Sequence, residues 1–334
     1  MQAQFDVGIY GVTGYTGVEL LKLMEHTAEY RIVLAQSKSA AGTRLGDAFP
    51  MLRKSADLRI VERGEVVPDI AFLCLPAGSS MKIAPELIAS GCRVIDLSPD
   101  YRLPVDTYET TYGMKHLDAG YIEKSAYGLS ELNRGRIAEA SLVANPGCYA
   151  TAVLLAIAPL SGLVWGTVYI DAKSGTSGSG REASSFNHHS EVAENIRPYN
   201  VNRHRHMPEI RSFLRSRGCD ANIVFVPHLI PIVRGMLATI FIPSVSAEQA
   251  MSQLAQTYEE SEFVHLVKIA NLKSVIGTNH CLIQVESAER GCIIIVCIDN
   301  LLKGASGQAL QNANIMLGLP EETGLRLLSA GVGI

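Results

Sequence analysis

A glycine-rich segment near the N-terminus constrains the fold of this 334-residue chain most strongly. An apolar stretch at residues 5–10 runs into glycines at positions 8, 11, 14 and 17, and a helical pattern follows at residues 18–24. A glycine turn between a strand and a helix keeps side chains away from a bound pyrophosphate and directs helix N–H groups toward it. The spacing G-x-x-G-x-x-G also fits a glycine-rich hairpin, but the flanking strand and helix favour a dinucleotide site. The expected cofactor-binding residues here are Gly11, Thr13, Gly14, Tyr15, Thr16 and Gly17.

The end of the second expected strand, residues 30–35, indicates which dinucleotide binds. NAD-binding units often carry an acidic residue there for the ribose 2′-hydroxyl. This chain has Gln36 followed by Ser37, Lys38 and Ser39. A cation flanked by hydroxyls suits a 2′-phosphate, so we expect these three residues to bind NADP. A solvated surface loop with an ordinary lysine is the alternative.

Further apolar strands alternate with helical segments in the first half of the chain. They are expected at residues 69–75, 92–98 and 141–144. Continuous apolar strands are typical of a parallel sheet buried on both faces. The first of them ends at Pro76, where we expect the next helix to begin and the cofactor to be contacted. The pattern predicts an α/β, Rossmann-type parallel sheet domain.

Residues 145–151, NPGCYAT, place Cys148 at the start of an apolar helical run that extends to about residue 160. A helix N-terminus carries partial positive charge and favours the thiolate, which is the nucleophilic form of cysteine. The same segment follows a strand, and open α/β sheets bind ligands at the carboxyl ends of their strands. We therefore predict that Cys148 is a nucleophile; a buried structural cysteine is the alternative.

The second half of the chain has a different organisation. Strands expected within residues 168–173, 222–227, 235–242, 281–285 and 292–298 are separated by loops more than by regular helices. This predicts an α+β substrate and dimerisation domain with a mixed or antiparallel sheet, whose exposed face suits an oligomer interface. We expect residues 1–147 with about 303–334 to form the NADP-binding domain. Residues 148–302 would form the catalytic domain.

In this half of the chain, candidate site residues lie on two loops and at the end of one strand. Residues 174–181, SGTSGSGR, could hold an anion through backbone N–H groups and Arg181, although a flexible linker fits the composition equally well. Residues 204–209, HRHMPE, could supply an acid–base histidine with Glu209 as its support, a metal site or a basic surface patch. Spacing does not rank His204 against His206. Asn300 could cap a helix expected from about residue 305, or reach a nicotinamide carboxamide.

Composition excludes several classes of protein. The net charge is −4, which does not suit a nucleic-acid surface. No run of 18 apolar residues predicts a membrane helix, and residues 1–6 do not resemble a signal peptide. Seven cysteines without a CxxC pair favour reduced thiols in a cytoplasmic protein, with no metal centre.

The motifs in order resemble the N-acetyl-γ-glutamyl-phosphate reductase family of the aspartate-semialdehyde-dehydrogenase-like group. The resemblance covers nearly the whole chain, and aspartate-semialdehyde enzymes lack the His-Arg-His-x-Pro-Glu segment. Its motifs lie at residues 11–20, 96–98, 127–131, 145–149, 174–178, 204–210 and 299–305.

The resemblance implies NADPH-dependent reduction of an acyl phosphate in arginine biosynthesis through a cysteine thioester. It implies Cys148 as nucleophile, His206 as acid and base, Glu209 as its support, and a dimer or tetramer acting on a small molecule. A reductase of α-aminoadipyl phosphate and a non-catalytic NADP-binding regulator are the alternatives. Further expected contacts are Ser177, Gly178 and Asn300 with the cofactor, and Asn145, Ser174 and Arg181 with the substrate.

Overall fold

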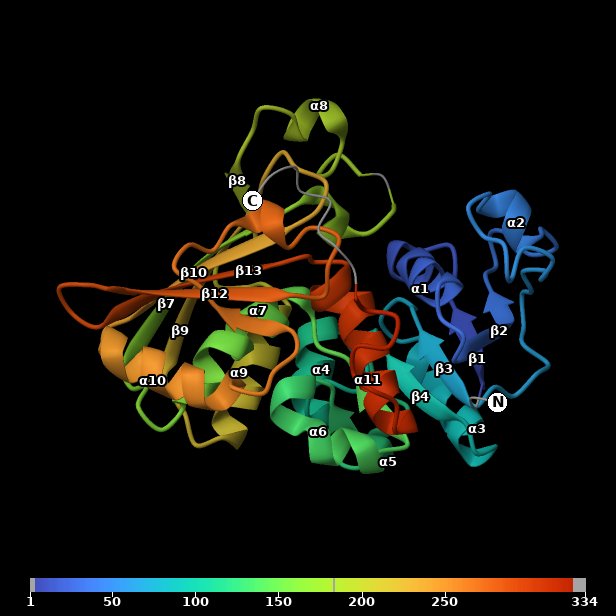
Figure 1. Cartoon of the computed structure of the whole chain (residues 1–334), viewed down its shortest axis with the longest axis horizontal. Coiled ribbons are helices and arrows are strands. Elements are labelled where there is room, and N and C mark those ends of the chain that lie inside the picture. Colours follow the sequence, from blue (N-terminus) through green and yellow to red (C-terminus); the bar gives the residue numbers. More distant parts are fainter. Residues whose placement is uncertain (1–3, 183, 327–334) are drawn as a thin grey trace. The chain divides into compact units, whose positions relative to one another are not determined.

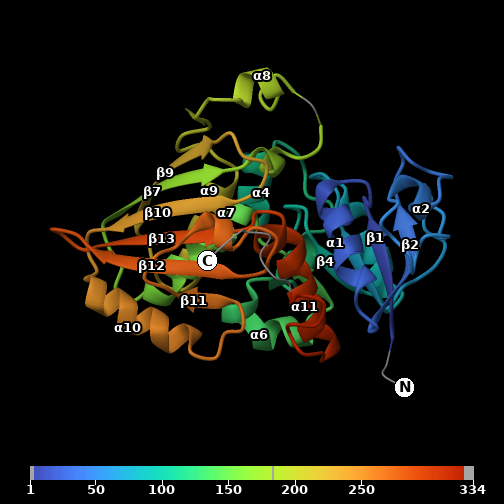
Figure 2. The same cartoon turned by 45° about the horizontal axis from the view of Figure 1, so that its top comes forward.

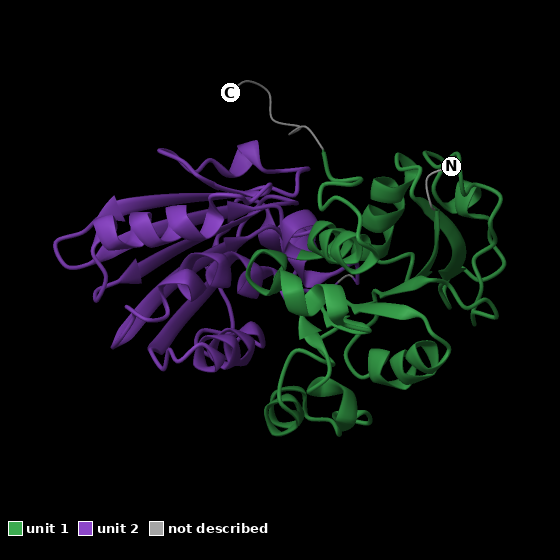
Figure 3. Ribbon diagram, turned by 60° about the horizontal axis from the view of Figure 1, so that its bottom comes forward, with its two compact units in different colours: residues 1–146, 305–326 green, residues 147–304, 327–334 purple. Residues whose placement is uncertain are grey.

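The computed structural model describes residues 4–182 and 184–326 and divides the chain into two compact units (Figure 3). Unit 1 takes the chain up to residue 146 together with residues 305–326, and unit 2 takes residues 147–304. The boundary between Pro146 and Gly147 falls one residue before Cys148. Two stretches discussed in the sequence analysis lie outside the described residues. They are residues 327–334, at the end of the expected NADP-binding domain, and residues 1–3, at the start of the N-terminal segment.

Unit 1 is built on a six-stranded sheet in which every pairing is parallel. Its strands are β1 (Phe5–Tyr10), β2 (Tyr30–Gln36), β3 (Ile70–Leu73), β4 (Arg93–Asp96), β5 (Ala126–Tyr127) and β6 (Leu142–Ala144), in the order β2-β1-β3-β4-β6-β5 (Figure 1). Its helices are α1 (Tyr15–Glu25), α2 (Leu45–Ala48), α3 (Ala84–Ala89), α4 (Val105–Tyr112), α5 (Ala119–Ile122), α6 (Ser130–Glu139) and α11 (Gly307–Leu317). Strands β3 and β6 are buried along their whole length, as expected for a sheet covered on both faces. The Rossmann-type prediction is confirmed.

Helix α11 belongs to unit 1 although it lies about 160 residues further along the chain. It packs against α1, α6 and β4. Its buried Asn312 donates hydrogen bonds to the carbonyl of Gly128 and to Oδ1 of Asn145, at 2.8 and 3.0 Å. These bonds satisfy polar groups that burial would otherwise leave without partners.

One helix begins later than expected. The chain after Pro76 forms a 3₁₀ turn at Ser80–Lys82 before α3 begins at Ala84. The delay has a physical cause, because Gly78 has φ +80° and the backbone amides of Gly78 and Met81 both bond to the buried carboxylate of Asp100. Near the C-terminus, a π-helical turn at Leu302–Ser306 precedes α11.

Unit 2 contains a seven-stranded mixed sheet, as the sequence predicts (Figure 2). Its strands are β7 (Thr167–Ser174), β8 (Arg197–Pro198), β9 (Asn222–Leu229), β10 (Met236–Ile242), β11 (Val264–Leu266), β12 (Cys281–Ser287) and β13 (Cys292–Ile298), in the order β11-β12-β13-β10-β7-β9-β8. Its α-helices are α7 (Cys148–Ile157), α8 (His189–Val192), α9 (His206–Ser216) and α10 (Ala247–Tyr258). Helix α10 was not predicted, although Ser246 and Gln249 form a capping box that is readable in the sequence.

Alternation along the strands of unit 2 gives the sheet two different faces. Ile170, Phe225 and Ile240 are fully or almost fully buried, and helices α7, α9 and α10 pack against the strands. On the opposite face, Tyr169 is 48 % exposed and packs against Phe241. One face therefore forms the core of the unit, and the other remains partly open.

Candidate active site

Cys148 is the first residue of helix α7 and is half-buried, whereas the rest of this helix is buried. Gly147 is the N-cap residue in an extended conformation and, having no side chain, offers no capping group. The first turn of α7 contains no acidic residue. The thiol therefore lies where helix N–H groups and the helix dipole favour an anion.

Glu209 holds the backbone immediately before the cysteine. The backbone amide of Gly147 donates a 2.9 Å hydrogen bond to Oε1 of Glu209. Glu209 is in the first turn of α9 and only 2 % exposed. The resemblance implies that Glu209 supports a histidine; the structure adds a direct bond from this carboxylate to the nucleophile's helix.

Two glycines allow close packing around Cys148. A Cβ atom on Gly147 would lie 2.5 Å from Nε2 of His206, so the imidazole packs directly against the backbone before the cysteine. A Cβ atom on Gly304 would lie 2.8 Å from Cβ of Cys148. Side chains at either position would displace the nucleophile or the imidazole beside it.

The structure distinguishes the two histidines that spacing left unranked. Nδ1 of His204 accepts a 3.1 Å hydrogen bond from the backbone amide of His206. Burial, with a smaller contribution from the Arg205 charge, lowers the pKa of His204 to about 4. His204 is therefore neutral at physiological pH and positions the start of α9, so His206 is the better candidate for proton transfer.

Two tyrosines extend the polar groups beside the cysteine. The hydroxyl of Tyr199 donates a 3.1 Å hydrogen bond to the hydroxyl of Tyr149. Burial raises the pKa of Tyr199 to about 12 and raises the pKa of Tyr149 further above its usual value. Both side chains are thus neutral hydrogen-bonding groups, and the sequence analysis predicted neither.

These groups meet at a cavity of about 420 Å³ within unit 2. Five candidates from the sequence line it: Cys148, Ser174, Gly178, His204 and His206. Tyr149, Tyr199, Asn200, Arg203 and Arg205 also line it and were not assigned a role from the sequence. Arg181, the expected substrate-binding arginine, is exposed and is not among the lining residues.

The loop after β7 does not offer the anion-binding backbone that its composition suggested. The amides of Gly175, Thr176 and Ser177 donate to the carbonyls of residues 235, 232 and 233, and the amide of Gly178 donates to Gly175. A Cβ atom on Gly175 would lie 2.6 Å from the Val233 carbonyl oxygen. Gly175 serves close docking of this loop on the chain, and the N–H groups of residues 175–178 are already used.

Two expected contact residues have structural partners. In unit 2, Asn300 accepts a hydrogen bond from the Gly235 amide and donates one to Oγ of Ser177, at 2.7 and 2.9 Å. In unit 1, Asn145 donates to the Ala305 carbonyl at 3.1 Å and accepts from Asn312. Asn300 therefore stabilises the backbone of unit 2, and Asn145 stabilises that of unit 1.

The glycine turn of unit 1 has the geometry that a dinucleotide requires. Gly11 has φ +79°, and a Cβ atom there would lie 2.2 Å from the Cys74 carbonyl oxygen. A Cβ atom on Gly17 would lie 2.6 Å from the Gly11 carbonyl oxygen. The turn is compact, and Gly14 leads into the N-terminus of α1 without a side-chain cap. The residues present therefore fit a pyrophosphate.

The remaining cofactor candidates lie on loops that follow the strands of unit 1. Thr13 and Ser37 share a 2.9 Å hydroxyl–hydroxyl hydrogen bond, and Ser37 bonds to Ser39 at 3.2 Å. Lys38 is exposed, as is Pro76 after β3. Hydroxyls and a cation at the end of β2, where NAD-binding units often have a carboxylate, fit a 2′-phosphate.

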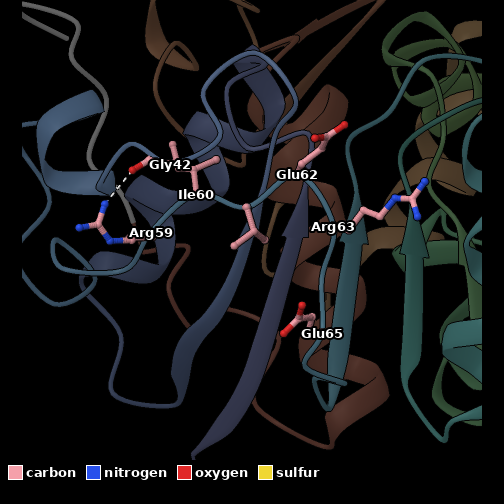
Figure 4. A pocket seen from close by; sticks show the side chains of 7 residues that line it. Gly42, Arg59, Ile60, Glu62, Arg63 and Glu65 are labelled. Atoms are coloured by element: carbon pink, nitrogen blue, oxygen red, sulfur yellow. Dashed lines mark hydrogen bonds between the residues drawn. The ribbon is translucent and has the colours of Figure 1, made fainter.

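A second cavity in unit 1 is lined by Arg59, Glu62, Arg63 and Glu65, among others. Arg59 donates a 2.9 Å hydrogen bond to the Gly42 carbonyl, while Arg63 points away from it (Figure 4). The charged side chains do not converge on one point (Figure 4). Within the described residues, no three His, Cys, Asp or Glu side chains gather as a metal site.

Comparison with known proteins shows which class of protein this chain belongs to. Residues 6–140 match the family model of the semialdehyde dehydrogenase NAD binding domain, and residues 148–300 match the semialdehyde dehydrogenase dimerisation domain. The fold is similar to aspartate semialdehyde dehydrogenase II from Vibrio cholerae (TM-score 0.73, 20 % identity, covering 95 % of this chain and 99 % of that one). It is also similar to the NADP complex of the Candida albicans enzyme (TM-score 0.70, 15 % identity, 94 % and 99 % coverage). The chain is an oxidoreductase of the semialdehyde dehydrogenase type.

Curated relatives identify the family within that class. An N-acetyl-gamma-glutamyl-phosphate reductase of Marinobacter nauticus is 44 % identical over 96 % of this chain and 97 % of its own length. The enzyme of the same name from Acinetobacter baylyi is 42 % identical over 98 % and 99 %. This chain belongs to the N-acetyl-γ-glutamyl-phosphate reductase family. Among the described residues, none of the helices has the length and apolar character needed to span a bilayer.

Proposed function

We propose that this protein reduces N-acetyl-γ-glutamyl phosphate to N-acetyl-glutamate γ-semialdehyde and phosphate with NADPH, a step of arginine biosynthesis. The observation that carries the proposal is that Cys148, at a helix start, and His206, packed against the adjacent Gly147, line one cavity. Family membership supports the choice of substrate.

The first chemical step belongs to Cys148. Its thiolate attacks the γ-carbonyl carbon, a C–S bond forms, and the carbon–oxygen bond to phosphate breaks with release of inorganic phosphate. The Gly147 amide is already bonded to Glu209, so the oxyanion is stabilised by amides of the first turn of α7 that begins at Cys148. Each well-aimed donor of this kind contributes roughly 2.7–4 kcal/mol.

The residues that would bind the cofactor belong to unit 1. The turn at residues 11–17 would hold the pyrophosphate, and Ser37, Lys38 and Ser39 would hold the 2′-phosphate, with Pro76 at the next strand end. NADPH, when bound, supplies the hydride that reduces the thioester carbon. Gln36 in place of an acidic residue at the end of β2 favours NADP over NAD.

His206 balances the charge during reduction. Its imidazolium donates a proton to the alkoxide that forms on the thioester carbon. The imidazole takes the proton back as the C–S bond breaks, which releases the aldehyde and restores the Cys148 thiolate. Neutral His204 holds the backbone amide of His206 throughout.

The assembly that we infer is a homo-oligomer in the cytoplasm. The partly open face of the unit 2 sheet, where Tyr169 and Phe241 lie, would pack against a second copy. Residues 148–300 match a dimerisation domain, which supports assembly through unit 2. All seven cysteines lie in the described part of the chain and none forms a disulfide, in keeping with a reducing compartment.

A steady-state assay in the reverse direction tests the function. N-acetyl-glutamate γ-semialdehyde, phosphate and NADP⁺ should give NADPH, and N-acetyl-2-aminoadipate semialdehyde, which is one methylene longer, should react more slowly. Cys148→Ser should abolish turnover and leave NADPH binding intact. Cys292→Ser, which removes a buried thiol at the start of β13, is the matched control. Turnover in the Cys148→Ser variant would refute the covalent route.

A further inference from the structure

Two arginines give the cavity of unit 2 a strong positive charge. Arg203 and Arg205 both line it, and both side chains are exposed. No Asp or Glu is among the lining residues in the described part of the chain. Neither guanidinium forms an ion pair or hydrogen bond within the described residues. Two cations without acidic partners at a concave site are suited to binding anions.

The backbone that carries Arg203 is held in an unusual conformation. Asn200 and Asn202 have φ angles of +45° and +54°, in the left-handed region that few residues other than glycine adopt. Asn202 is bonded twice to Phe225 on β9: its amide donates to the Phe225 carbonyl, and its Oδ1 accepts from the Phe225 amide. The Arg203 amide donates to the Asn200 carbonyl at 2.9 Å. The loop is therefore fixed to the sheet one residue before this arginine.

Arg205 is nearer than Arg203 to His206 in the sequence, and its charge affects groups beside the proposed reacting residues. It stands between His204 and His206 and directly precedes α9. Its charge acts on the His204 imidazole and on the hydroxyl of Tyr199. The charge of Cys148 acts on that same hydroxyl, so Tyr199 lies within electrostatic reach of both the guanidinium and the sulfur.

We propose that Arg205 binds the phosphoryl group that leaves from the carbon attacked by Cys148, and that Arg203 binds the α-carboxylate at the other end of the substrate. This assignment rests on the proposed function. A substrate with two anionic groups separated by a carbon chain matches two cations, one beside the imidazole pair and one on the fixed loop. It replaces Arg181, which does not line the cavity, as the substrate-binding arginine.

The reverse reaction separates the two roles, because phosphate and the semialdehyde then enter as independent substrates. Arg205→Gln should raise KM for phosphate roughly ten- to hundredfold, the effect of losing a hydrogen bond to a charged group, and leave KM for the semialdehyde nearly unchanged. Arg203→Gln should show the opposite pattern. 4-Acetamidobutanal, which lacks the α-carboxylate, should react poorly with wild type and lose nothing further in Arg203→Gln.

Controls keep the outcomes distinct. Arg290→Gln, an exposed arginine between β12 and β13, should change neither KM. Arg205→Lys retains a charge and should recover part of the phosphate affinity, and thermal unfolding identifies any variant that fails to fold. Folded variants in which both KM values rise together, or neither rises, would overturn the assignment. A wild-type protein without turnover would instead overturn the proposed function.

Discussion

The carboxylate of Glu209 and the backbone amide of Gly147 are joined by a 2.9 Å hydrogen bond, one residue before the candidate nucleophile. The same glycine has no Cβ atom, and the imidazole of His206 occupies the space where one would be. The first turn of α9 thus fixes the first turn of α7 at two points. The position of the sulfur depends on this contact between helices as much as on the local sequence.

The bond to Gly147 predicts different effects for two substitutions of Glu209. Glu209→Gln keeps an oxygen acceptor, so kcat should remain within about tenfold of wild type. Glu209→Ala leaves a buried amide without this acceptor and should lower the free energy of unfolding by about 1–3 kcal/mol, with a larger loss of kcat. Urea unfolding and steady-state kinetics measure both. An equal loss of kcat in the two variants would show that the negative charge, and not the acceptor, is what matters.

Gly147→Ala should impair catalysis without loss of the fold. The new Cβ would lie 2.5 Å from Nε2 of His206, so the imidazole must move. A displacement of about 1 Å at a reacting group can cost about 100-fold in kcat. Gly162→Ala is the matched control, because a Cβ atom there meets nothing within 4 Å. Equal kcat values for the two variants would contradict the placement of His206.

The two histidines should differ in how strongly kcat depends on them. Burial lowers the pKa of His204 to about 4, so its titration lies below the working range. His206→Asn should lower kcat by roughly 10²–10⁴-fold, whereas His204→Asn should lower kcat less because His204 only holds the backbone at the start of α9. His204 also affects the free energy of unfolding, because the folded state favours its neutral form. This stabilisation is present above pH 6.5 and is lost as pH falls through about 4. A larger loss of kcat in His204→Asn than in His206→Asn would reverse the two assigned roles.

Asp96 should also make the stability of the protein depend on pH, but with the sign opposite to that of His204. Burial, with the nearby charge of Asp100, raises its pKa from 3.8 to about 7. The folded state therefore holds a proton that the unfolded chain releases, and this stability is present below pH 3.8 and lost as pH rises through about 7. Asp96→Asn should flatten the profile between pH 4 and 7 in urea unfolding followed by circular dichroism. Asp57→Asn, at a position whose side chain is 95 % exposed, should leave the slope unchanged.

The elements that the sequence predicted are those with strong local patterns. The buried strands, the helix start at Cys148 and the glycine turn at residues 11–17 all appear where local pattern places them. Boundaries differ from the predicted ones where a distant side chain intervenes, as when Asp100 holds the turn after β3 and delays α3. Helix α10 was missed although its capping box was readable.

The sequence alone determined that two units of different architecture are present, and it placed a cysteine at a helix start next to their boundary. These features depend on residue type and spacing over a few positions. Only the tertiary structure decided that Glu209 bonds to Gly147, that His204 is buried and neutral, and that Arg203 and Arg205 line the cavity whereas Arg181 does not. The physical reason is that burial and hydrogen-bond partners arise from strand pairing and helix packing between segments far apart in the chain, which a local pattern does not encode.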